Sequence, residues 1–262
     1  MDKSFQDKRS STPKSANLIL HCHGGGFIAH SSKSHEIYLK PWCKELHIPI
    51  VSIDYSLAPE SPFPKASIEC FYVYIWCILN KDMLGWTGEK IVCVGDSAGG
   101  VLVTNIVQRA IMAGIRIPDA LVPIYTPFLL SYSLSPSRLM SVMDPLLNLG
   151  ILWRCLAAYC GIDFKSFDSA DSDSLKRLLE VNKPFDSNSI TTDKTETEEK
   201  EKNLKVLQNL IGNSVYLIEL LRNHQLPSNP LMSPLLSDDN LLKKMPKTYL
   251  IVSFIFNKFL TV

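Results

Sequence analysis

The sequence lacks any apolar stretch long enough to cross a membrane. Its longest apolar run is 70–79, and Glu69 and Asn80 bound that run. A helix needs about 20 apolar residues to span a bilayer, so we expect no transmembrane segment. The start of the chain, 1–14, is polar and charged, without the apolar centre of a secretory signal. The net charge is only +1, so no general electrostatic field favours binding to nucleic acid.

The cysteines also lack a pattern. The chain has seven of them, an odd number, and no two stand in a CxxC spacing. This argues against a disulfide framework or a zinc ribbon and favours reduced thiols in a cytoplasmic protein. We expect neither a metal nor a cofactor.

What the sequence does contain is a regular alternation of short apolar runs and helical segments. Of its 262 residues, 46% are hydrophobic and 20% are charged, which is enough for one sizeable core. The expected strands are 17–22, 48–54, 91–95, 120–125 and 248–254, and the expected helices are 35–46, 66–80 and 98–113. This order predicts an α/β fold, with a mostly parallel sheet covered by helices on both faces.

Composition divides the chain into four regions. We expect a disordered N-terminal segment (1–16), an α/β core (17–160), a polar and partly disordered insertion (161–228) and a return to the core (229–262). The insertion is rich in Ser, Asp, Lys and Glu and contains the run TTDKTETEEKEK. Only 203–221 shows some helical periodicity. Such a composition buries too little apolar surface to fold by itself, and we expect it to carry no catalytic group.

The strongest chemical signal is the G-x-S-x-G motif Gly95-Asp96-Ser97-Ala98-Gly99, which lies between an expected strand and an expected helix. A sharp turn at this place exposes the serine hydroxyl, and glycines two residues before and after it let neighbouring backbone come close. The amino terminus of the following helix directs its amide dipoles toward developing negative charge. The motif therefore predicts a nucleophilic serine.

A second signal is His23-Gly24-Gly25-Gly26-Phe27, directly after the first expected strand. Consecutive glycines can direct backbone amides at an oxyanion without obstruction by side chains, and the companion donor is the amide after the nucleophile. Two alternatives have less support. A phosphate-binding loop would continue with Lys and Ser or Thr, where this chain has Phe. A metal pair of His21 and His23 has no third ligand at a useful spacing.

Together the motifs carry a family resemblance. The sequence resembles the hormone-sensitive lipase family of α/β-hydrolases in HGGGF (23–27), SIDYSLAPESPFPKA (52–66), GDSAGG (95–100), SPSRLMSVMDPLL (135–147) and NPLMSPLL (229–236). The resemblance implies a carboxylic-ester hydrolase without a cofactor that acts on acylglycerols or sterol esters. It also implies a lipid ester as partner, and leaves open a peripheral contact with lipid droplets.

The resemblance further implies a role for each residue of the motifs. Ser97 would attack the ester carbonyl and form an acyl-enzyme that water resolves. Gly24, Gly25 and Ala98 would supply the oxyanion donors. The supporting residues would be His23 and Gly26 in the glycine loop and Gly95, Asp96 and Gly99 at the nucleophile. Asp54, Tyr55 and Glu60 would form a structural turn near the pocket, where Asp54 fits best as a strand-end cap.

The family's remaining catalytic groups have no counterpart in the sequence. A serine nucleophile needs a histidine base and an orienting carboxylate, which follow it along the chain in this fold. The single histidine after Ser97 is His224, in the polar insertion, and no acid follows the strand that begins near Thr248. We therefore expect a fold incomplete at its N- and C-terminal ends, truncated relative to the family. The alternatives to an active hydrolase are a catalytically dead acyl-binding or regulatory isoform and a non-functional fragment.

Overall fold

The computed structural model describes residues 13–131, 147, 149–162 and 224–252. Most of the block 135–147 and of the expected insertion 161–228 therefore lies outside the described residues, as do 1–12 and 253–262. Five strands form one sheet in the order β2-β1-β3-β4-β5, and every neighbouring pair is parallel. The strands are β1 (Ser15–Cys22), β2 (Ile50–Ile53), β3 (Trp86–Asp96), β4 (Ala120–Ile124) and β5 (Lys247–Thr248).

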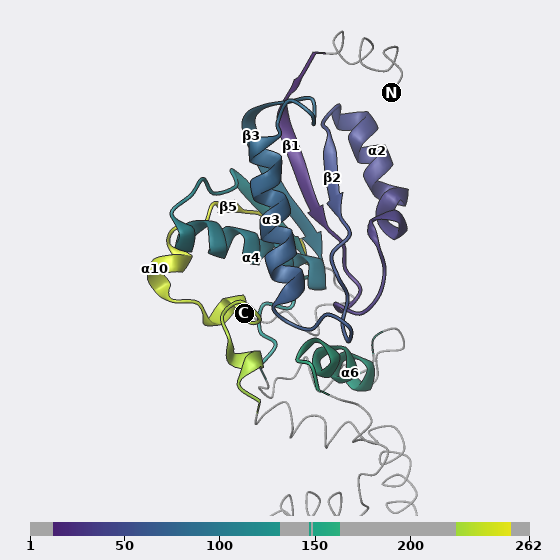
Figure 1. Ribbon diagram of the computed structural model, residues 1–262, viewed down its shortest axis with the longest axis vertical. Helices are drawn as coiled ribbons and strands as arrows, with labels where there is room; N and C mark the ends of the chain where they lie inside the picture. The colour runs from purple at the N-terminus through teal and green to yellow at the C-terminus, as the bar shows by residue number, and fades with distance from the viewer. Residues whose placement is uncertain (1–12, 132–146, 148, 163–223, 253–262) are drawn as a thin grey trace, which may run out of the picture.

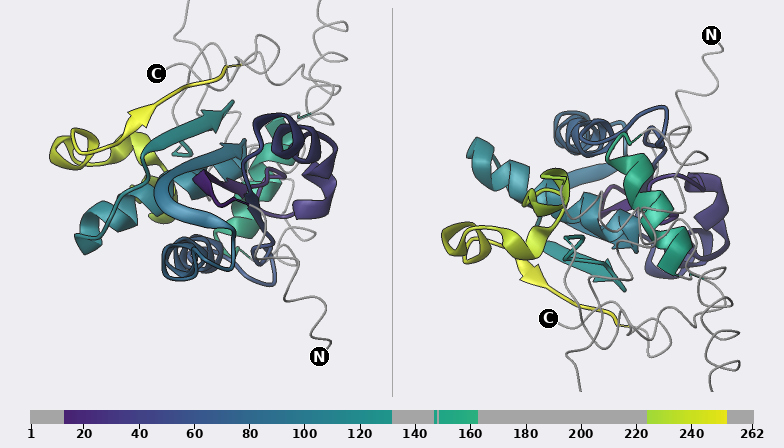
Figure 2. Two further views of the ribbon diagram at one scale, coloured as in Figure 1. Left: turned by 90° about the horizontal axis from the view of Figure 1, so that it is seen from above. Right: turned by 90° about the horizontal axis from the view of Figure 1, so that it is seen from below.

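Helices cover both faces of this sheet, which confirms the expected α/β class. They are η2 (Ser32–His35), α2 (Glu36–Leu46), α3 (Lys65–Leu79), α4 (Ala98–Ala113), α6 (Leu149–Tyr159), η5 (Leu226–Ser228), η6 (Pro234–Leu236) and α10 (Asp239–Leu242). The views from above and below place α2 on one side of the sheet and α3 on the other (Figure 2). In the part of the chain that is described, no helix is long and apolar enough to pass through a membrane.

The core lies between the central strands and α4. Leu18 and Leu20 of β1 and Ile91 of β3 are fully buried. Helix α4 packs against α3 and against β1, β3 and β4, and it has buried residues along almost its whole length, including Val101 and Ile106. A parallel sheet covered on both faces needs such continuously apolar segments rather than alternating ones. The core therefore fixes the end of β3 and the start of α4, where the motif serine lies.

Two strands differ from expectation in their extent. Strand β3 begins at Trp86 instead of residue 91, because the fully buried Trp86 indole donates a 3.1 Å hydrogen bond to the Ala16 carbonyl oxygen. Strand β5 is shorter than expected. Beyond it, the amides of Tyr249 and Ile251 still donate to the carbonyl oxygens of Leu121 and Pro123 in β4, so the chain continues along the sheet edge to the end of the described part.

Residues 224–252, called here the return segment, are attached to the core through a buried serine. The Ser233 hydroxyl donates to the Pro227 carbonyl oxygen at 2.6 Å and accepts the amides of Leu130 at 2.8 Å and Ser131 at 3.1 Å. Since Ser233 is fully buried, these bonds compensate for its lost hydration. The short helix η5 therefore packs with the core, although it lies inside the stretch assigned above to the insertion.

Candidate active site

Ser97 occupies the turn that joins β3 to α4, as the motif predicts. Its backbone has φ 52° and ψ −120°, a conformation that residues with a side chain rarely adopt. Strain of this kind costs about 1–3 kcal/mol and persists where the surrounding structure enforces it, most often at functional sites. The Ser97 amide is held by a 2.9 Å hydrogen bond to the Ile124 carbonyl oxygen in β4. The sequence motif thus produces a strained, fixed serine at the carboxyl edge of the sheet.

The glycines around Ser97 are required by close backbone contacts. A Cβ atom at Gly95 would lie well under 3.0 Å from the Gly99 carbonyl oxygen, and one at Gly99 would lie equally close to the carbonyl oxygens of Cys22 and His23. Backbone atoms cannot move aside as a flexible side chain can. The turn therefore brings the start of α4 into direct contact with the end of β1, which carries the second motif.

The glycine loop, residues 23–27, lies beside the turn because β1 and β3 are parallel neighbours, with Cys22 paired to Gly95. Gly25 has φ 112° and Gly26 has φ 62°, backbone conformations that glycine adopts without steric cost. The Gly25 carbonyl oxygen accepts the amides of Ile28 and Ala29. This tight turn brings the glycine amides and Ser97 to one edge of the sheet.

The Gly24 amide has another partner than the one expected. It donates to Oδ1 of Asp96 at 3.1 Å, so it is already used inside the folded protein. In the described residues the amides of Gly25 and Gly26 have no acceptor. The Ala98 amide opens α4, where N–H groups lack partners within the helix. The hydrogen bonding thus corrects the expectation for Gly24, which ties the loop to the turn, and leaves Gly25, Gly26 and Ala98 as the available donors.

Asp96 is the centre of a buried polar network. Besides the Gly24 amide, its carboxylate accepts the hydroxyls of Tyr125 at 3.1 Å and Tyr38 at 3.3 Å. The imidazoles of His35 and His21 approach it to 3.4 Å and 3.7 Å. Three of these partners, His35, Tyr38 and Tyr125, had no role in the sequence analysis. His35 and Tyr38 lie at the start of α2 and Tyr125 follows β4, so they meet only in the folded chain. In the sequence, only the aspartate of the G-x-S-x-G motif pointed to this place.

This network changes the ionisation of Asp96. Burial by itself would raise the pKa of the carboxyl group, but the close approach of the His21 and His35 imidazoles and the Tyr125 hydroxyl outweigh it and lower the pKa to about 2. The carboxylate is thus held ionised, which suits a group that accepts several hydrogen bonds and donates none.

The lowered pKa gives a testable pH dependence. An Asp in an unfolded chain has a pKa of about 3.9, so ionised Asp96 stabilises the folded state above that pH and loses this contribution as the pH falls through its folded value. We expect the stability difference between the wild type and Asp96→Asn, measured by urea unfolding, to shrink between roughly pH 5 and pH 2. The exposed Glu45 offers the control Glu45→Gln, for which a difference of the same size would contradict this role of Asp96.

His23 is placed to hold the glycine loop. Its Nδ1 donates to the Gly24 carbonyl oxygen at 2.7 Å, while its own carbonyl oxygen accepts the Tyr55 hydroxyl at 2.7 Å. The two rings stack with centroids 4.2 Å apart. Burial is the main cause of a lowered pKa for His23, which favours the neutral imidazole. The contacts agree with the bracing role that the resemblance implies.

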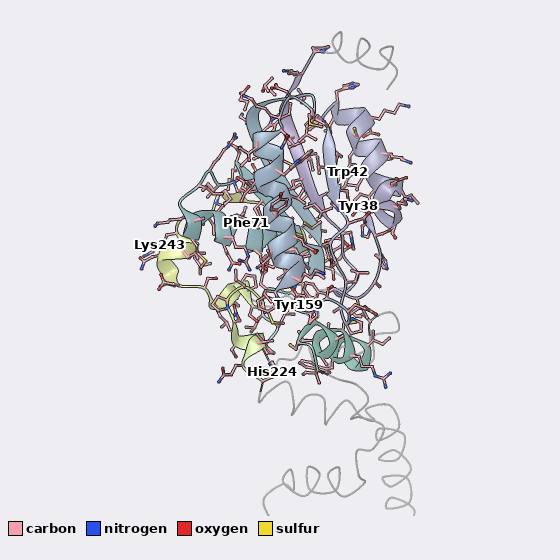
Figure 3. The ribbon with its side chains drawn as sticks, in the orientation of Figure 1. Tyr38, Trp42, Phe71, Tyr159, His224 and Lys243 are labelled. Atoms are coloured by element: carbon pink, nitrogen blue, oxygen red, sulfur yellow. The ribbon has the colours of Figure 1, made fainter. Side chains whose placement is uncertain are left out.

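Within the described residues no hydrogen bond joins the Ser97 hydroxyl to a histidine, and His21, His23 and His224 have other partners. His21 uses both ring nitrogens, with Ser52 at 2.9 Å and Tyr38 at 3.0 Å. His224 lies in the return segment (Figure 3), and its Nδ1 accepts the Leu226 amide at 3.2 Å. An imidazole that accepts at Nδ1 carries its proton on Nε2, so this tautomer has no free acceptor for a serine proton.

Two carboxylates, one after β2 and one in α3, have structural roles. Asp54 accepts the Ser32 amide at 2.6 Å and the Ser32 hydroxyl at 2.9 Å. The amide hydrogen bond is the main cause of the lowered pKa of Asp54. Glu69 in the same way accepts the Ser56 amide and hydroxyl, both at 2.7 Å. Asp54, directly after β2, thus holds the start of η2 at the end of that strand. In the described part of the chain, no group of three or more His, Cys, Asp or Glu side chains is arranged to hold a metal.

Aromatic side chains form an apolar wall beside the glycine loop. The Phe27 ring stacks on Tyr159 of α6 with centroids 3.8 Å apart, and Phe63 meets Tyr159 edge to face at 5.7 Å. Figure 3 shows Tyr159 where α6 meets the start of α3. Cys155 of α6 lies against Gly26, where a Cβ atom would come within 3.0 Å of its sulfur. Helix α6 thus covers the loop and contributes apolar surface next to the donors.

Comparison with known proteins agrees with this geometry. Residues 19–176 match the model of a family described as having the alpha/beta hydrolase fold. Hormone-sensitive lipase of Mus musculus is 51% identical over 163 residues, which cover 62% of this chain and 22% of that protein. Lipase 2 of Moraxella sp. (strain TA144) is 37% identical over 110 residues, 42% of this chain and 25% of that protein. The chain thus spans about a quarter or less of the length of these relatives.

Solved structures show the same architecture. Carboxyl esterase 2 from the mycorrhizal fungus Tuber melanosporum superposes with a TM-score of 0.65 at 17% identity, covering 95% of this chain and 63% of that one. An esterase from Pyrobaculum calidifontis superposes with a TM-score of 0.62 at 22% identity, covering 92% and 59%. At these identities the likeness concerns the fold.

Proposed function

Because this chain belongs to the family with the alpha/beta hydrolase fold that its residues 19–176 match, we propose that it is a carboxylic-ester hydrolase of the hormone-sensitive lipase type with Ser97 as its nucleophile. The observation that carries the proposal is the strained backbone of Ser97 at the turn between β3 and α4, beside the glycine loop. In this fold such a turn exposes the serine hydroxyl above the sheet.

In the proposed reaction, Ser97 Oγ attacks the carbonyl carbon of an ester as a neutral hydroxyl, and its proton passes to water, because His21, His23 and His224 hold other partners within the described residues. The negative charge that develops on the carbonyl oxygen is stabilised by backbone amides that are already oriented. We assign these donors to Gly25, Gly26 and Ala98, because the Gly24 amide donates to Asp96. Release of the alcohol leaves an acyl-enzyme, which water hydrolyses.

We propose lipid esters, acylglycerols or sterol esters, as the substrate class. The wall formed by Phe27, Tyr159 and Phe63 makes the surroundings of the donors apolar, which suits a lipid ester better than a polar one. Relatives named as lipases point the same way. All seven cysteines are free thiols, which supports a cytoplasmic location, and a lipid substrate would bring the protein into peripheral contact with lipid droplets. The proposed chemistry needs neither a metal nor another cofactor.

One observation favours a second candidate, an acyl-binding or regulatory protein without turnover. The Ser97 hydroxyl has no hydrogen-bond partner within the described residues, and His21, His23 and His224 make other hydrogen bonds there. A protein of this kind would retain the apolar wall and the glycine loop but would not activate its serine.

Covalent labelling tests the assignment of Ser97. We expect an alkyl fluorophosphonate to react slowly but selectively at Ser97, because the phosphonate oxygen formed on attack occupies the same donor site as an ester oxyanion. Intact-mass and peptide mass spectrometry would follow the modification over hours, with Ser97→Ala as control. Labelling spread over several serines, or equal in the Ser97→Ala variant, would contradict the assignment.

A further inference from the structure

Helix α3 presents an apolar surface to solvent. Ile68, Tyr72, Trp76 and Leu79 follow one another at intervals of three or four residues and thus share one side of the helix, and Met83 follows in the turn after it. These five residues are called here the α3 apolar face. Their exposed fractions are 50%, 69%, 37%, 76% and 64%. A helix on the surface of a soluble domain ordinarily turns polar residues to water, and an apolar patch of this kind marks an interaction site.

The opposite side of α3 is committed to the core. Cys70, Tyr74 and Cys77 are fully buried, and the Tyr74 hydroxyl donates to the Arg116 carbonyl oxygen at 2.6 Å. The helix is therefore apolar on both sides, and the domain needs only one of them for its own packing. In Figure 1, α3 lies at the front of the sheet with its outer side uncovered by any described element.

Charges of both signs flank the α3 apolar face, and the two lysines at its ends have no carboxylate partner in the described residues. Within the helix the charged residues are Lys65 and Glu69, and both oxygens of Glu69 are occupied by Ser56. Lys65 donates to the Ser61 hydroxyl at 3.2 Å. In the described residues neither Lys65 nor Lys81 forms an ion pair with a carboxylate, whereas Asp82 is paired with Lys14 at 2.7 Å.

We propose that the α3 apolar face is the surface by which this protein lies on a phospholipid layer. Tyr and Trp rings are enriched at the level of lipid head groups, where one end of the side chain is apolar and the other hydrated. The aliphatic side chains of Ile68, Leu79 and Met83 would enter the acyl boundary, as in other helices that lie in the interface plane. Lys65 and Lys81, at the two ends of the face, would meet lipid phosphates.

The position of α3 would also bring the acyl wall near the lipid. The Phe63 amide, two residues before the helix, donates to the Tyr159 carbonyl oxygen at 2.8 Å, and Pro62 packs against Gly161. The start of α3 is thus joined to the end of α6, which covers the glycine loop. The choice of lipid as partner rests on the proposed function, since a lipid-ester hydrolase meets its substrate at a lipid surface.

Flotation with vesicles of phosphatidylcholine and phosphatidylserine tests the proposal without any measurement of catalysis. We expect residues 1–262 to float with these vesicles. The triple variant Tyr72→Ser/Trp76→Ser/Leu79→Ser should bind them at least about tenfold more weakly, because it loses most of the apolar area available for burial. The matched control is Ile37→Ser/Leu46→Ser, which removes exposed apolar side chains from α2. The control should float like the wild type, and circular dichroism should show all three proteins folded.

Other outcomes would overturn the proposal. A wild type that does not float, or a triple variant that floats as well as the wild type, would exclude α3 as the lipid-binding surface. A wild-type dimer that the triple variant converts to a monomer, with vesicle binding unchanged, would assign the face to self-association. Fluorophosphonate labelling of Ser97 in the same variants separates the role of α3 in lipid binding from the role of Ser97 in catalysis. Loss of lipid binding with labelling intact concerns α3 alone.

Discussion

The polypeptide of residues 1–262 will hydrolyse p-nitrophenyl butyrate at a rate close to that of its Ser97→Ala variant, and both rates will lie far below ordinary enzyme turnover of about 1–10³ per second. Within the described residues no imidazole accepts a hydrogen bond from the Ser97 hydroxyl, so Ser97 must attack as a neutral hydroxyl. Loss of a triad member in serine hydrolases lowers turnover by about 10⁴- to 10⁶-fold, while donors and binding leave a residual acceleration of about 10³- to 10⁴-fold over water.

The measurement compares the wild type, Ser97→Ala and buffer at equal protein concentration. Turnover in the ordinary range that Ser97→Ala abolishes would refute the expectation and would require a base among the histidines of this chain. His224→Ala would then be assayed first and His21→Ala and His23→Ala next, since folding can be monitored in each by circular dichroism. Near-background rates in both proteins are the expected result and would show that residues 1–262 lack the base that the proposed chemistry needs for turnover, as the acyl-binding candidate does.

Gly99→Ala will prevent stable folding. The new Cβ atom would lie well under 3.0 Å from the carbonyl oxygens of Cys22 and His23, and these belong to a central strand and to the glycine loop, which cannot withdraw. Overpacking in a tight core costs about 1–3 kcal/mol and more where backbone must move, against a total stability of about 5–15 kcal/mol for a domain. We expect a loss of more than about 3 kcal/mol in urea unfolding, or insoluble protein on expression.

Gly114→Ala is the matched control for this prediction. Gly114 directly follows α4, but a Cβ atom there would meet nothing within 4 Å. Its φ of 64° means that alanine costs only the strain of a left-handed conformation, about 1–2 kcal/mol. If Gly99→Ala were no more destabilising than Gly114→Ala, the contact between α4 and the end of β1 would not be tight.

The sequence predicts the elements whose patterns are local. The strands β1, β2 and β4 correspond to short, continuous apolar runs. The helices α2, α3 and α4 correspond to the longer segments between such runs. The start of β3 is different, since residues 87–90 are polar or flexible. They extend as a strand because β1 pairs with Trp86 and with Lys90, with a register shift between the two pairs, and because Trp86 is buried. Tertiary contacts of this kind override local preference.

The same division holds at the site. The G-x-S-x-G spacing predicts the turn at Ser97, because the motif requires only a strand before it and a helix after it. Spacing does not reveal in which direction an amide points, so the use of Gly24 by Asp96 became visible only in the structure. The partners His35, Tyr38 and Tyr125 were not predicted, because no local pattern records that the start of α2 and the end of β4 meet at one carboxylate.

The bond between Asp96 and Gly24 has a consequence for how the site moves. Asp96 is the covalent neighbour of Ser97, and Gly24 is the neighbour of Gly25, so one 3.1 Å hydrogen bond joins the segment of the nucleophile to the segment of the donors. Thermal displacement of either segment carries the other with it, and their relative position is preserved. The attacking atom and the donors are then aligned once, when the chain folds, and the loss of entropy does not recur at each encounter with an ester.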